Sequence, residues 1–416
     1  MKIFKFGGAS VKSANGVKNL AAVLNTTGFK NTLIVISAMG KTTNALETVI
    51  FNYFNNKTEL QSSLQEVIKY HNDILFDLFE NENHLIFKKT KAFFDELNNF
   101  FKTNKSPNYN FVYDQVVGFG ELVSTTIISD YLNSIGIKNQ WIDSRECIKT
   151  DSYYRRANVN WKETQTNISK TLNTSVLNIT QGFLGSDSNY FTTTLGREGS
   201  DYTAAIFAYC LNAESVTIWK DVPGVLNADP RYFENAQLLH KISYREAIEL
   251  AFYGASVIHP KTLQPIQHKE IPLHVKSFLN PQDSGTTVTK GIAIEPKIPC
   301  FIVKKNQILI SLSSLDFSYI VEENISEIFK LLHTYKMKVH VIQNSAISFS
   351  VCIDNIYNNL DALLQQLKAK FSVNCHENVS LYTIRHYNES ALNKIEQGKT
   401  VLLKQLTQET VQIVTK

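Results

Sequence analysis

The segment that most constrains this chain is a glycine-bracketed loop within Thr192–Ala205, which reads TTTLGREGSDYTAA. Two glycines enclose an Arg-Glu pair, and the apolar segment Ala204–Leu211 follows, so the pattern predicts a loop that enters a helix capped by Ser200 or Asp201. Backbone N–H groups at a helix start favour anions, glycine lets an anion approach closely, and Arg197 can hold a carboxylate by two hydrogen bonds. The alternative is a capped surface helix after an ordinary turn.

The residues around this loop favour a binding site. Val176–Phe183 has the composition of a strand that delivers the chain to the loop, and Ser215–Asp221 has that of a buried strand ending in a charged pair. A turn-rich connection, Val222–Arg231, comes next. A strand, a polar tip and a glycine turn in this order are typical of a ligand crevice at the carboxyl ends of strands in an open α/β sheet.

The amino terminus repeats this arrangement. Ile3–Phe6 suits a buried strand, and Gly7 and Gly8 bend the chain into a helix that Ser10 is expected to cap. Lys5 is unusual, because burying an unpaired ammonium group in a core strand is costly. We therefore expect Lys5 to face an anion, a phosphate, in a strand-end crevice. The alternative is a lysine on an edge strand with its ammonium group in water.

Two further strand–helix junctions carry small polar or acidic side chains. Asn31–Gly40 is predicted to be a strand that runs into a helix start with Thr43 and Asn44, which either cap the helix or bind a polar substrate. Glu121 is interpreted as lying at a third glycine-marked helix start, after Phe111–Val117. Its carboxylate would either stabilise the helix dipole or accept hydrogen bonds from a substrate ammonium group.

The composition excludes several classes of protein. The chain has 416 residues, 43% of them hydrophobic, which is enough for two domains or more. A net charge of +4 is too small to indicate nucleic acid or an anionic membrane surface as a partner. We find no targeting segment and no membrane span. Five cysteines without CxxC spacing and ten histidines without an HxxxH pair indicate a reduced, cytoplasmic protein with no zinc or other side-chain metal site.

Four motifs, in order over residues 1–289, resemble those of the aspartate kinases. Lys5–Ser10 (KFGGAS) resembles their opening KFGGTS, and Thr194–Asp201 (TLGREGSD) resembles their GRGGSD loop. Trp219–Val225 together with Ala228–Arg231 is similar to their nucleotide segment. Ser243–Pro260 is similar to the helix and His-Pro turn that close their kinase domain.

The resemblance implies an α/β fold, in which residues 1–290 form an open, mostly parallel sheet sandwiched by helices, the amino acid kinase fold. Residues 298–376 follow as a βαββα pattern of the ferredoxin-like type, which resembles an ACT module. Residues 377–416 begin the same pattern again as a second, shortened ACT module, completed by a strand from 300–304. We expect a monofunctional form, because the length leaves no room for the homoserine dehydrogenase domain of some family members.

The activity implied is ATP-dependent phosphorylation of the side-chain carboxylate of L-aspartate to 4-phospho-L-aspartate, the first step toward lysine, threonine and methionine. Phosphoryl transfer mainly requires positive charge and fixed donors around an anionic transition state. Mg²⁺ would bridge the nucleotide phosphates with few protein ligands. A catalytic base is not required, since the substrate carboxylate is ionised near neutral pH.

The resemblance also implies residue roles, which fall into three groups. Catalytic roles fall to Lys5 and Asp201. The residues that would hold aspartate are Thr43, Asn44, Glu121, Arg197 and Ser200. The residues that would line the nucleotide site are Gly7, Gly8, Ser10, Lys220, Asp221, Leu226, Arg231, Ser256 and Val257.

The carboxyl-terminal modules imply regulation. ACT modules of the family pair side by side and bind amino-acid end products, which implies a homodimer and an effector, lysine or threonine. We place that effector near Val341, Asn344 and Ser345, where polar residues interrupt apolar strands. The alternative is a dimerisation sheet that has lost its ligand.

Three departures from the family pattern leave other functions open. Ala9 replaces a threonine, Glu198 replaces a glycine, and Ser256 stands where many members carry a basic residue. These changes motivate a non-catalytic amino-acid-sensing protein with a decayed kinase domain as one alternative. A kinase of the same fold that uses glutamate, acetylglutamate or a nucleoside monophosphate is another.

Overall fold

A computed structural model describes residues 1–81, 83–255, 258–316 and 318–416, and the chain divides into two compact units. The first unit comprises Met1–Val225, Leu238–Ile248 and Val257–Ala293. The second comprises Leu226–Gln237, Glu249–Ser256 and Ile294–Lys416. The predicted nucleotide residues Ser256 and Val257 lie outside the described residues.

The first unit is built on an eight-stranded sheet with the strand order β3-β4-β2-β1-β7-β9-β10-β8, and all of its pairs are parallel except β9 with β10. Its strands are β1 (Lys2–Phe6), β2 (Thr32–Ile36), β3 (Asn139–Ile142), β4 (Leu177–Gln181), β7 (Ser215–Lys220), β8 (Lys241–Ser243), β9 (Leu273–Ser277) and β10 (Thr286–Thr289), with β5 (Leu184–Ser186) and β6 (Thr192–Thr194) forming a separate hairpin. Its helices are η1 (Gly8–Val11), α1 (Ala14–Thr27), α2 (Thr42–Asn55), α3 (Leu60–Leu78), α4 (Leu85–Thr103), α5 (Tyr109–Ser134), α6 (Ser144–Cys147), α7 (Trp161–Thr171), α8 (Gly199–Leu211) and α10 (Pro260–His268), whereas α9 (Tyr244–Tyr253) continues into the second unit.

Lys5 lies on an interior strand of this sheet. β1 pairs with β2 on one side and with β7 on the other, and Lys5 is in register with Val35 and Ile218. Phe4 and Phe6 point into the large core formed with α1 to α5, so Lys5 faces the opposite side of the sheet. The edge-strand alternative for Lys5 is therefore wrong.

The cap predicted for the first helix is also wrong. Ser10 lies in the short helix η1, where its hydroxyl donates a hydrogen bond to the Gly7 carbonyl at 2.5 Å. α1 begins later, and its cap is Ser13, whose side chain accepts a hydrogen bond from the Gly16 N–H at 3.3 Å. A tight turn after Gly7 uses the residues that we had assigned to the start of α1.

Glu121 does not lie at a helix start. α5 is one helix of 26 residues, and Glu121 lies near its middle. The glycines before it allow close packing instead of marking a boundary, because a Cβ on Gly120 would lie 3.0 Å from the Ala38 Cβ and 3.1 Å from the Thr42 Cγ2. The prediction of a third strand–helix junction is thus wrong, although Glu121 still lies beside the junction of β2 and α2.

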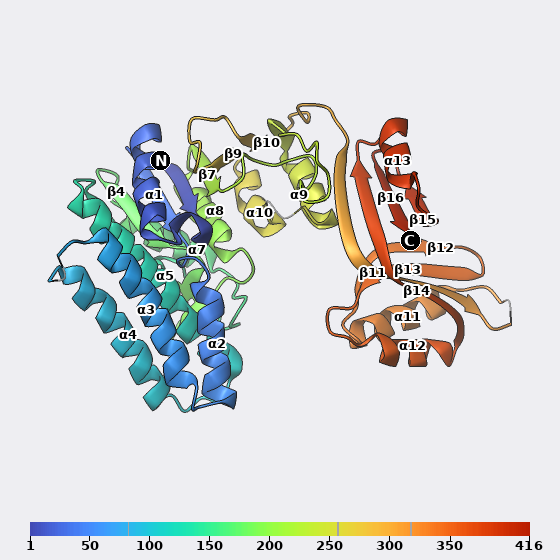
Figure 1. The fold of residues 1–416 in the computed structure, drawn as a ribbon, viewed down its shortest axis with the longest axis horizontal. Helices are drawn as coiled ribbons and strands as arrows, with labels where there is room; N and C mark the ends of the chain where they lie inside the picture. The colour runs from blue at the N-terminus through green and yellow to red at the C-terminus, as the bar shows by residue number, and fades with distance from the viewer. Residues whose placement is uncertain (82, 256–257, 317) are drawn as a thin grey trace. The chain divides into compact units, whose positions relative to one another are not determined.

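The second unit contains a six-stranded antiparallel sheet with the order β12-β13-β11-β14-β16-β15. Its elements are β11 (Cys300–Ser314), α11 (Glu322–Thr334), β12 (Lys338–Asn344), β13 (Ser348–Asp354), α12 (Leu360–Lys368), β14 (Phe371–Arg385), α13 (Glu389–Glu396), β15 (Val401–Leu406) and β16 (Thr410–Thr415). The two helices α11 and α12 lie below the sheet in Figure 1 and bury one face of its β12-β13-β11-β14 part. The predicted fold class, a mostly parallel α/β sheet followed by ferredoxin-like antiparallel modules, is confirmed.

Two long strands run through both halves of this sheet. The first part of β11, Cys300–Lys304, pairs with Leu381–Arg385 of β14, and the later part of β11 pairs with Phe371–His376. β16 then pairs with the Leu381–Arg385 half, so Cys300–Lys304 lies in the same half-sheet as β15 and β16. Among the described residues, no helix has the length and apolar character that crossing a membrane requires.

Candidate active site

A buried ion pair joins the amino-terminal strand to the glycine-bracketed loop. The Lys5 ammonium lies 2.6 Å from the Asp201 carboxylate, and both side chains are almost completely buried. Asp201 belongs to the first turn of α8, whose N-cap is Glu198 in the left-handed conformation, with no side-chain cap. The prediction that Ser200 or Asp201 caps α8 is wrong, because the loop enters the helix two residues earlier, and Asp201 is left free to bind Lys5.

The glycine corner after β1 packs directly against the corner after β2. The Gly40 N–H donates to the Gly8 carbonyl at 3.0 Å, and a Cβ on Gly8 would lie 2.7 Å from the Ala38 carbonyl oxygen. Only glycine fits at position 8 without a shift of the backbone. The strand ends that carry the predicted phosphate residues Gly7 and Gly8 therefore meet the helix start that carries Thr43.

Thr43 and Asn44 lie in the first turn of α2, Thr43 half-buried and Asn44 exposed. The neighbouring Thr42 is buried, and its hydroxyl donates to the Met39 carbonyl at 2.6 Å. That hydroxyl is also 3.4 Å from Nε2 of His71, whose pKa burial lowers to about 4. The Thr42 hydroxyl is therefore occupied by Met39 and the neutral His71. The neighbouring Thr43 is the threonine at this helix start that can face a ligand.

Glu121 is a buried acid with an unfilled acceptor. Its side chain is 3% exposed, and within the described residues its Oε2 has no hydrogen-bond partner. Burial raises the pKa of Glu121 to about 8, although a hydrogen bond from the Ala38 N–H opposes the shift. A carboxylate in this position is suited to a ligand that brings its own positive charge, such as an ammonium group.

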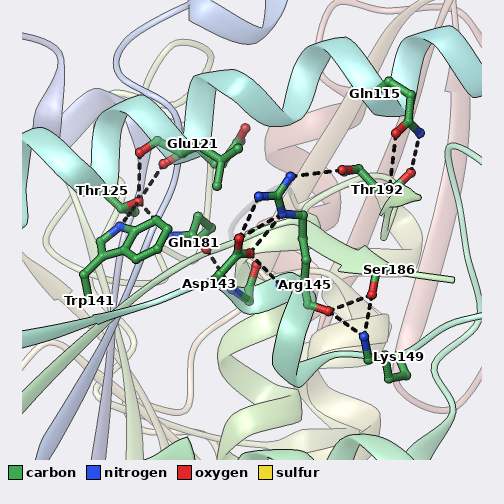
Figure 2. A network of polar contacts seen from close by, with 12 residues as sticks. Gln115, Glu121, Thr125, Trp141, Asp143, Arg145, Lys149, Gln181, Ser186 and Thr192 are labelled. Atoms are coloured by element: carbon green, nitrogen blue, oxygen red, sulfur yellow. Dashed lines mark hydrogen bonds and ion pairs between the residues drawn. The ribbon is translucent and has the colours of Figure 1, made fainter. Parts of the chain in front are cut away.

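Polar contacts fix the part of α5 that carries Glu121 (Figure 2). The Thr125 hydroxyl donates to the Glu121 carbonyl at 2.8 Å, and it accepts hydrogen bonds from Gln181 at 2.8 Å and from the Trp141 indole at 3.0 Å. Because Gln181 ends β4 and Trp141 belongs to β3, the helix is tied to two strands at this level. Glu121 is held on a rigid support.

The end of β4 packs against the first turn of α8. A Cβ on Gly182 would lie 2.4 Å from the Ser200 Cβ, and the Phe183 N–H donates to the Thr203 hydroxyl at 2.9 Å. Ser200 is buried in this contact. The ends of β1, β2 and β4 thereby converge with α8 and the middle of α5 at one edge of the sheet.

The loop itself presents one open charge. Arg197 is exposed, and within the described part of the chain it makes no ion pair or hydrogen bond. The neighbouring Glu198 has a left-handed backbone and a buried Oε2 that likewise lacks a partner among the described residues. The loop is anchored two residues before Arg197, because the Lys261 ammonium donates to the Leu195 carbonyl at 2.9 Å.

The remaining predicted residues are divided between the units. Lys220 ends β7 with Asp221 directly after it, the former half-buried and the latter exposed, and both belong to the first unit. Leu226 and Arg231 belong to the second unit, where Arg231 is exposed and pairs with Asp229 at 2.6 Å.

The residues predicted to hold an effector all lie in the second unit, in or just after β12. Val341 is buried, whereas Asn344 and Ser345 are exposed. The Ser345 hydroxyl is bonded to that of Ser348 at 2.7 Å.

Sequence reasoning missed Asp114. This residue is fully buried in the second turn of α5 and is bonded to the segment before the glycine-bracketed loop. A single acid within the apolar run FVYDQVVGFG was the available signal. The pattern alone does not tell such an acid from a solvated residue on a helix surface.

Comparison with known proteins gives consistent matches. The model of the amino acid kinase family matches residues 1–277. Lysine-sensitive aspartokinase 3 of Escherichia coli (strain K12) is 30% identical over 403 residues, covering 92% of this chain and 86% of the relative. Aspartokinase 1, chloroplastic, of Arabidopsis thaliana is 31% identical, covering 89% and 68%. The bifunctional aspartokinase/homoserine dehydrogenase 2, chloroplastic, of the same plant is 28% identical. The match covers 89% of this chain but only 42% of that relative.

Solved structures extend the similarity to the fold of the chain. The structure of E. coli aspartokinase III in complex with lysine and aspartate (T-state) matches with a TM-score of 0.85 and 27% identity, covering 100% of this chain and 95% of that one. The structure of the same enzyme in complex with aspartate and ADP (R-state) matches with a TM-score of 0.80 and 26% identity, covering 100% and 96%.

Proposed function

The chain belongs to the amino acid kinase family, with aspartokinases as relatives over most of its length, and on that premise we propose that it phosphorylates L-aspartate. ATP donates the phosphoryl group and the side-chain carboxylate accepts it, so the product is 4-phospho-L-aspartate. The observation that carries this proposal is the buried Lys5–Asp201 pair beside two glycine corners and the unfilled acid Glu121. A related structure holds aspartate and ADP, the substrate and the nucleotide product of such a reaction.

Lys5 supplies the positive charge. Its ammonium group emerges from an interior strand, and Asp201 fixes its direction at 2.6 Å. The backbone at Gly7 and Gly8 can approach the phosphates without obstruction, with Ser10 beside it. A fixed cation and oriented N–H groups stabilise the charge that develops on the transferring phosphoryl group, and they require no reorganisation during the reaction.

Glu121 and Arg197 hold the two ends of aspartate. Glu121 accepts the substrate ammonium group, which fills its vacant oxygen, and Arg197 binds a carboxylate by a charge-assisted contact. Thr43, Asn44 and Ser200 add hydrogen bonds from the helix starts around them. This arrangement favours a compact amino dicarboxylate over a nucleoside monophosphate, which has no ammonium group for Glu121.

Lys220 and Asp221 line the nucleotide site in the first unit, and we assign Leu226, Arg231, Ser256 and Val257 to the same function. Mg²⁺ accompanies the nucleotide. Among the described residues there is no group of three or more His, Cys, Asp or Glu side chains that could hold a metal ion. We therefore propose that the nucleotide phosphates and water supply most of the Mg²⁺ ligands.

The catalytic domain is assigned to residues 1–290, and two ACT modules to 298–376 and to 377–416 with 300–304. We propose that the modules pair two chains into a homodimer and that lysine is the effector, bound near Val341, Asn344 and Ser345. Support comes from a relative named as lysine-sensitive and from a related structure in complex with lysine. Calorimetric titration with lysine, threonine and methionine tests the effector; threonine would be the second candidate, and absence of heat with all three would remove the sensor.

We place the protein in the cytoplasm. None of the five cysteines forms a disulfide, and four of them are buried. Reduced thiols of this kind are typical of a reducing compartment.

The function is tested by coupling ADP release to aspartate and by trapping the acyl phosphate with hydroxylamine. We expect both signals with L-aspartate and neither with glutamate, acetylglutamate or a nucleoside monophosphate. Activity on one of those instead would identify a kinase of another substrate. If no ADP forms with any acceptor while calorimetry still detects an amino acid, the chain is a non-catalytic sensor and the proposal is wrong.

A further inference from the structure

Asp114 joins three segments that are far apart in the chain. Its carboxylate is fully buried in α5 and accepts hydrogen bonds from the Thr194 N–H and the Thr194 hydroxyl, both at 2.8 Å. It also accepts the Arg155 N–H, with 3.0 Å to each carboxylate oxygen. The contacts reach 41 residues along the chain to Arg155 and 80 residues to Thr194. A buried carboxylate with this many donors fixes the relative positions of the backbones that it joins.

The two bonded segments lead directly into the substrate loop. Thr194 ends β6, and its carbonyl accepts the Ala157 N–H at 2.9 Å, so the segments also bond to each other. Gly196 lies against the same turn, since a Cβ there would lie 3.2 Å from the Arg155 carbonyl oxygen. Arg197 follows one residue later. The start of the loop is therefore held from α5 through Asp114.

Arg155 is held in an unusual conformation by the same bond. Its backbone is left-handed, with φ of 71°, which is uncommon for a residue with a side chain. Its guanidinium lies over the Tyr113 ring at 4.3 Å, and Tyr113 neighbours Asp114 on α5. The backbone of Arg155 thus contacts Asp114, and its side chain contacts Tyr113, in the same turn of α5.

The same helix carries Glu121. Glu121 follows Asp114 by seven residues, about two turns of an α-helix, so the two side chains project from the same face. One end of the substrate is assigned to Glu121 and the other to Arg197. The distance between these two groups depends on how α5 is joined to the loop. Asp114 forms the part of that junction nearest the loop, and Gln115 forms the rest, since its side chain exchanges hydrogen bonds with the Thr192 backbone at 2.8 and 3.2 Å (Figure 2).

We propose that Asp114 is a positioning residue that sets the spacing between Glu121 and the Arg197 loop and thereby determines the affinity for the amino dicarboxylate substrate. The inference rests on the proposed function. It assigns to Asp114 no contact with substrate, nucleotide or phosphoryl group. The effect is transmitted through Thr194 and Arg155.

Asp114→Asn in the full-length chain tests the proposal. An asparagine keeps the size of the side chain but turns one acceptor into a donor that faces N–H groups. We expect the KM for aspartate to rise about tenfold, because small misplacements of binding groups have large effects on substrate positioning. The KM for ATP should stay at the wild-type value, and the fall in kcat should be smaller than the rise in the aspartate KM.

Asp187→Asn is the matched control. Asp187 is also buried and accepts two backbone N–H groups, from Asn189 at 2.9 Å and Phe191 at 3.0 Å. In the described part of the chain, its other oxygen accepts only the Tyr154 hydroxyl, at 3.2 Å, and no backbone group of the segment that leads into the loop. It lies at the tip of the β5–β6 hairpin, whereas Asp114 binds the hairpin end that enters the loop. Asp187→Asn should lower the melting temperature without raising the aspartate KM.

Thr194→Val removes one hydroxyl and keeps the backbone bond, so it should raise the aspartate KM about twofold to threefold. This variant decides the matter if Asp114→Asn does not fold. An unchanged aspartate KM in the folded Asp114→Asn or in Thr194→Val would overturn the proposal, and so would an equal rise in Asp187→Asn. These results presuppose wild-type turnover of aspartate, so loss of the proposed function would appear first, as an inactive wild type.

Discussion

Each unit of the molecule has a carboxylate in or beside its sheet, and the two carboxylates differ in whether both oxygens have a hydrogen-bond donor. In the second unit His340 Nε2 donates to one Asp354 oxygen at 2.7 Å, and Gln307 donates to the other at 2.7 Å. The Lys304 ammonium lies 2.9 Å from His340 Nδ1. In the first unit Glu121 keeps a vacant oxygen, and Arg197 has no partner within the described residues.

The pKa values follow this difference. Burial alone would raise the pKa of Asp354, but hydrogen bonds from His340 and Gln307 outweigh it and hold the pKa below its usual value. For Glu121 burial dominates and raises the pKa to about 8. Register shifts on both sides of Gln307 and at His340 interrupt the strand pairing where Lys304, Gln307, His340 and Asp354 meet. A carboxylate with a donor on each oxygen, like Asp354, indicates structure, whereas Glu121 with its vacant oxygen indicates a place for a ligand.

Replacing Lys5, the buried cation of the first unit, should have the largest effect. Lys5→Met is expected to lower kcat at least ~10²-fold, the effect typical of removing one preorganised group that stabilises developing charge. Lys2→Met is the control, since Lys2 is an exposed lysine on the same strand. Steady-state ADP release measures both variants. Equal activity of the two would show that the Lys5–Asp201 pair is structural, like Asp354 of the second unit.

Replacing Arg197, the exposed arginine of the loop, tests its contribution to aspartate binding. Arg197→Ala is expected to raise the aspartate KM roughly 10- to 100-fold, the loss of a hydrogen bond to a charged group, with a smaller effect on kcat. Arg245→Ala provides the control, as Arg245 is an exposed arginine on α9. If aspartate affinity survives in Arg197→Ala, the carboxylate assignment is wrong.

Because its pKa is raised, Glu121 should make kcat/KM for aspartate depend on pH. With a pKa of about 8, Glu121 is protonated in the free enzyme at lower pH, so kcat/KM for aspartate should rise as the pH increases toward that value. Glu121→Gln should lower kcat/KM about tenfold at pH 8.5 and flatten this part of the profile. A wild-type profile that is flat over this range would contradict the ammonium assignment.

The same variant has a consequence for stability. The pKa of Glu121 is raised on folding, so its stabilising contribution is complete below pH 4.5 and is lost as the pH rises through about 8. Glu121→Gln should therefore unfold at a higher temperature than the wild type at pH 9.

Asp354 in the second unit should change the pH dependence of stability in the opposite direction to Glu121, and its replacement should have the smallest effect of all. The pKa of Asp354 is lowered on folding, so its contribution is present above the ordinary aspartate pKa and is lost as the pH falls through the folded value. Asp354→Asn should cost about 1 kcal/mol of unfolding free energy at neutral pH, a modest figure because the pair is partly exposed. Chemical denaturation at pH 7 and pH 3 measures it, and the aspartate KM without effector should not change. A rise in that KM would mean that Asp354 takes part in substrate binding.

The sequence predicted what local chemistry determines and failed where the partners are remote. A lysine inside an apolar strand predicted a buried charge, and Lys5 is buried on an interior strand. The glycines around Glu121 were misinterpreted, because glycine serves both turns and close packing, and only the neighbouring Ala38 and Thr42 show which applies. Asp114 was missed because its donors are distant in the chain.

The long strands β11 and β14 have a consequence for biosynthesis. Cys300–Lys304 is translated before β12, β13, α11 and α12, but its partner Leu381–Arg385 is translated after them. The beginning of β11 must therefore wait for its β14 partner until Arg385 has been translated, and such delayed long-range pairing slows folding. A chain without β15 and β16 would leave the Leu381–Arg385 half of β14 as an exposed sheet edge, a feature that invites aggregation.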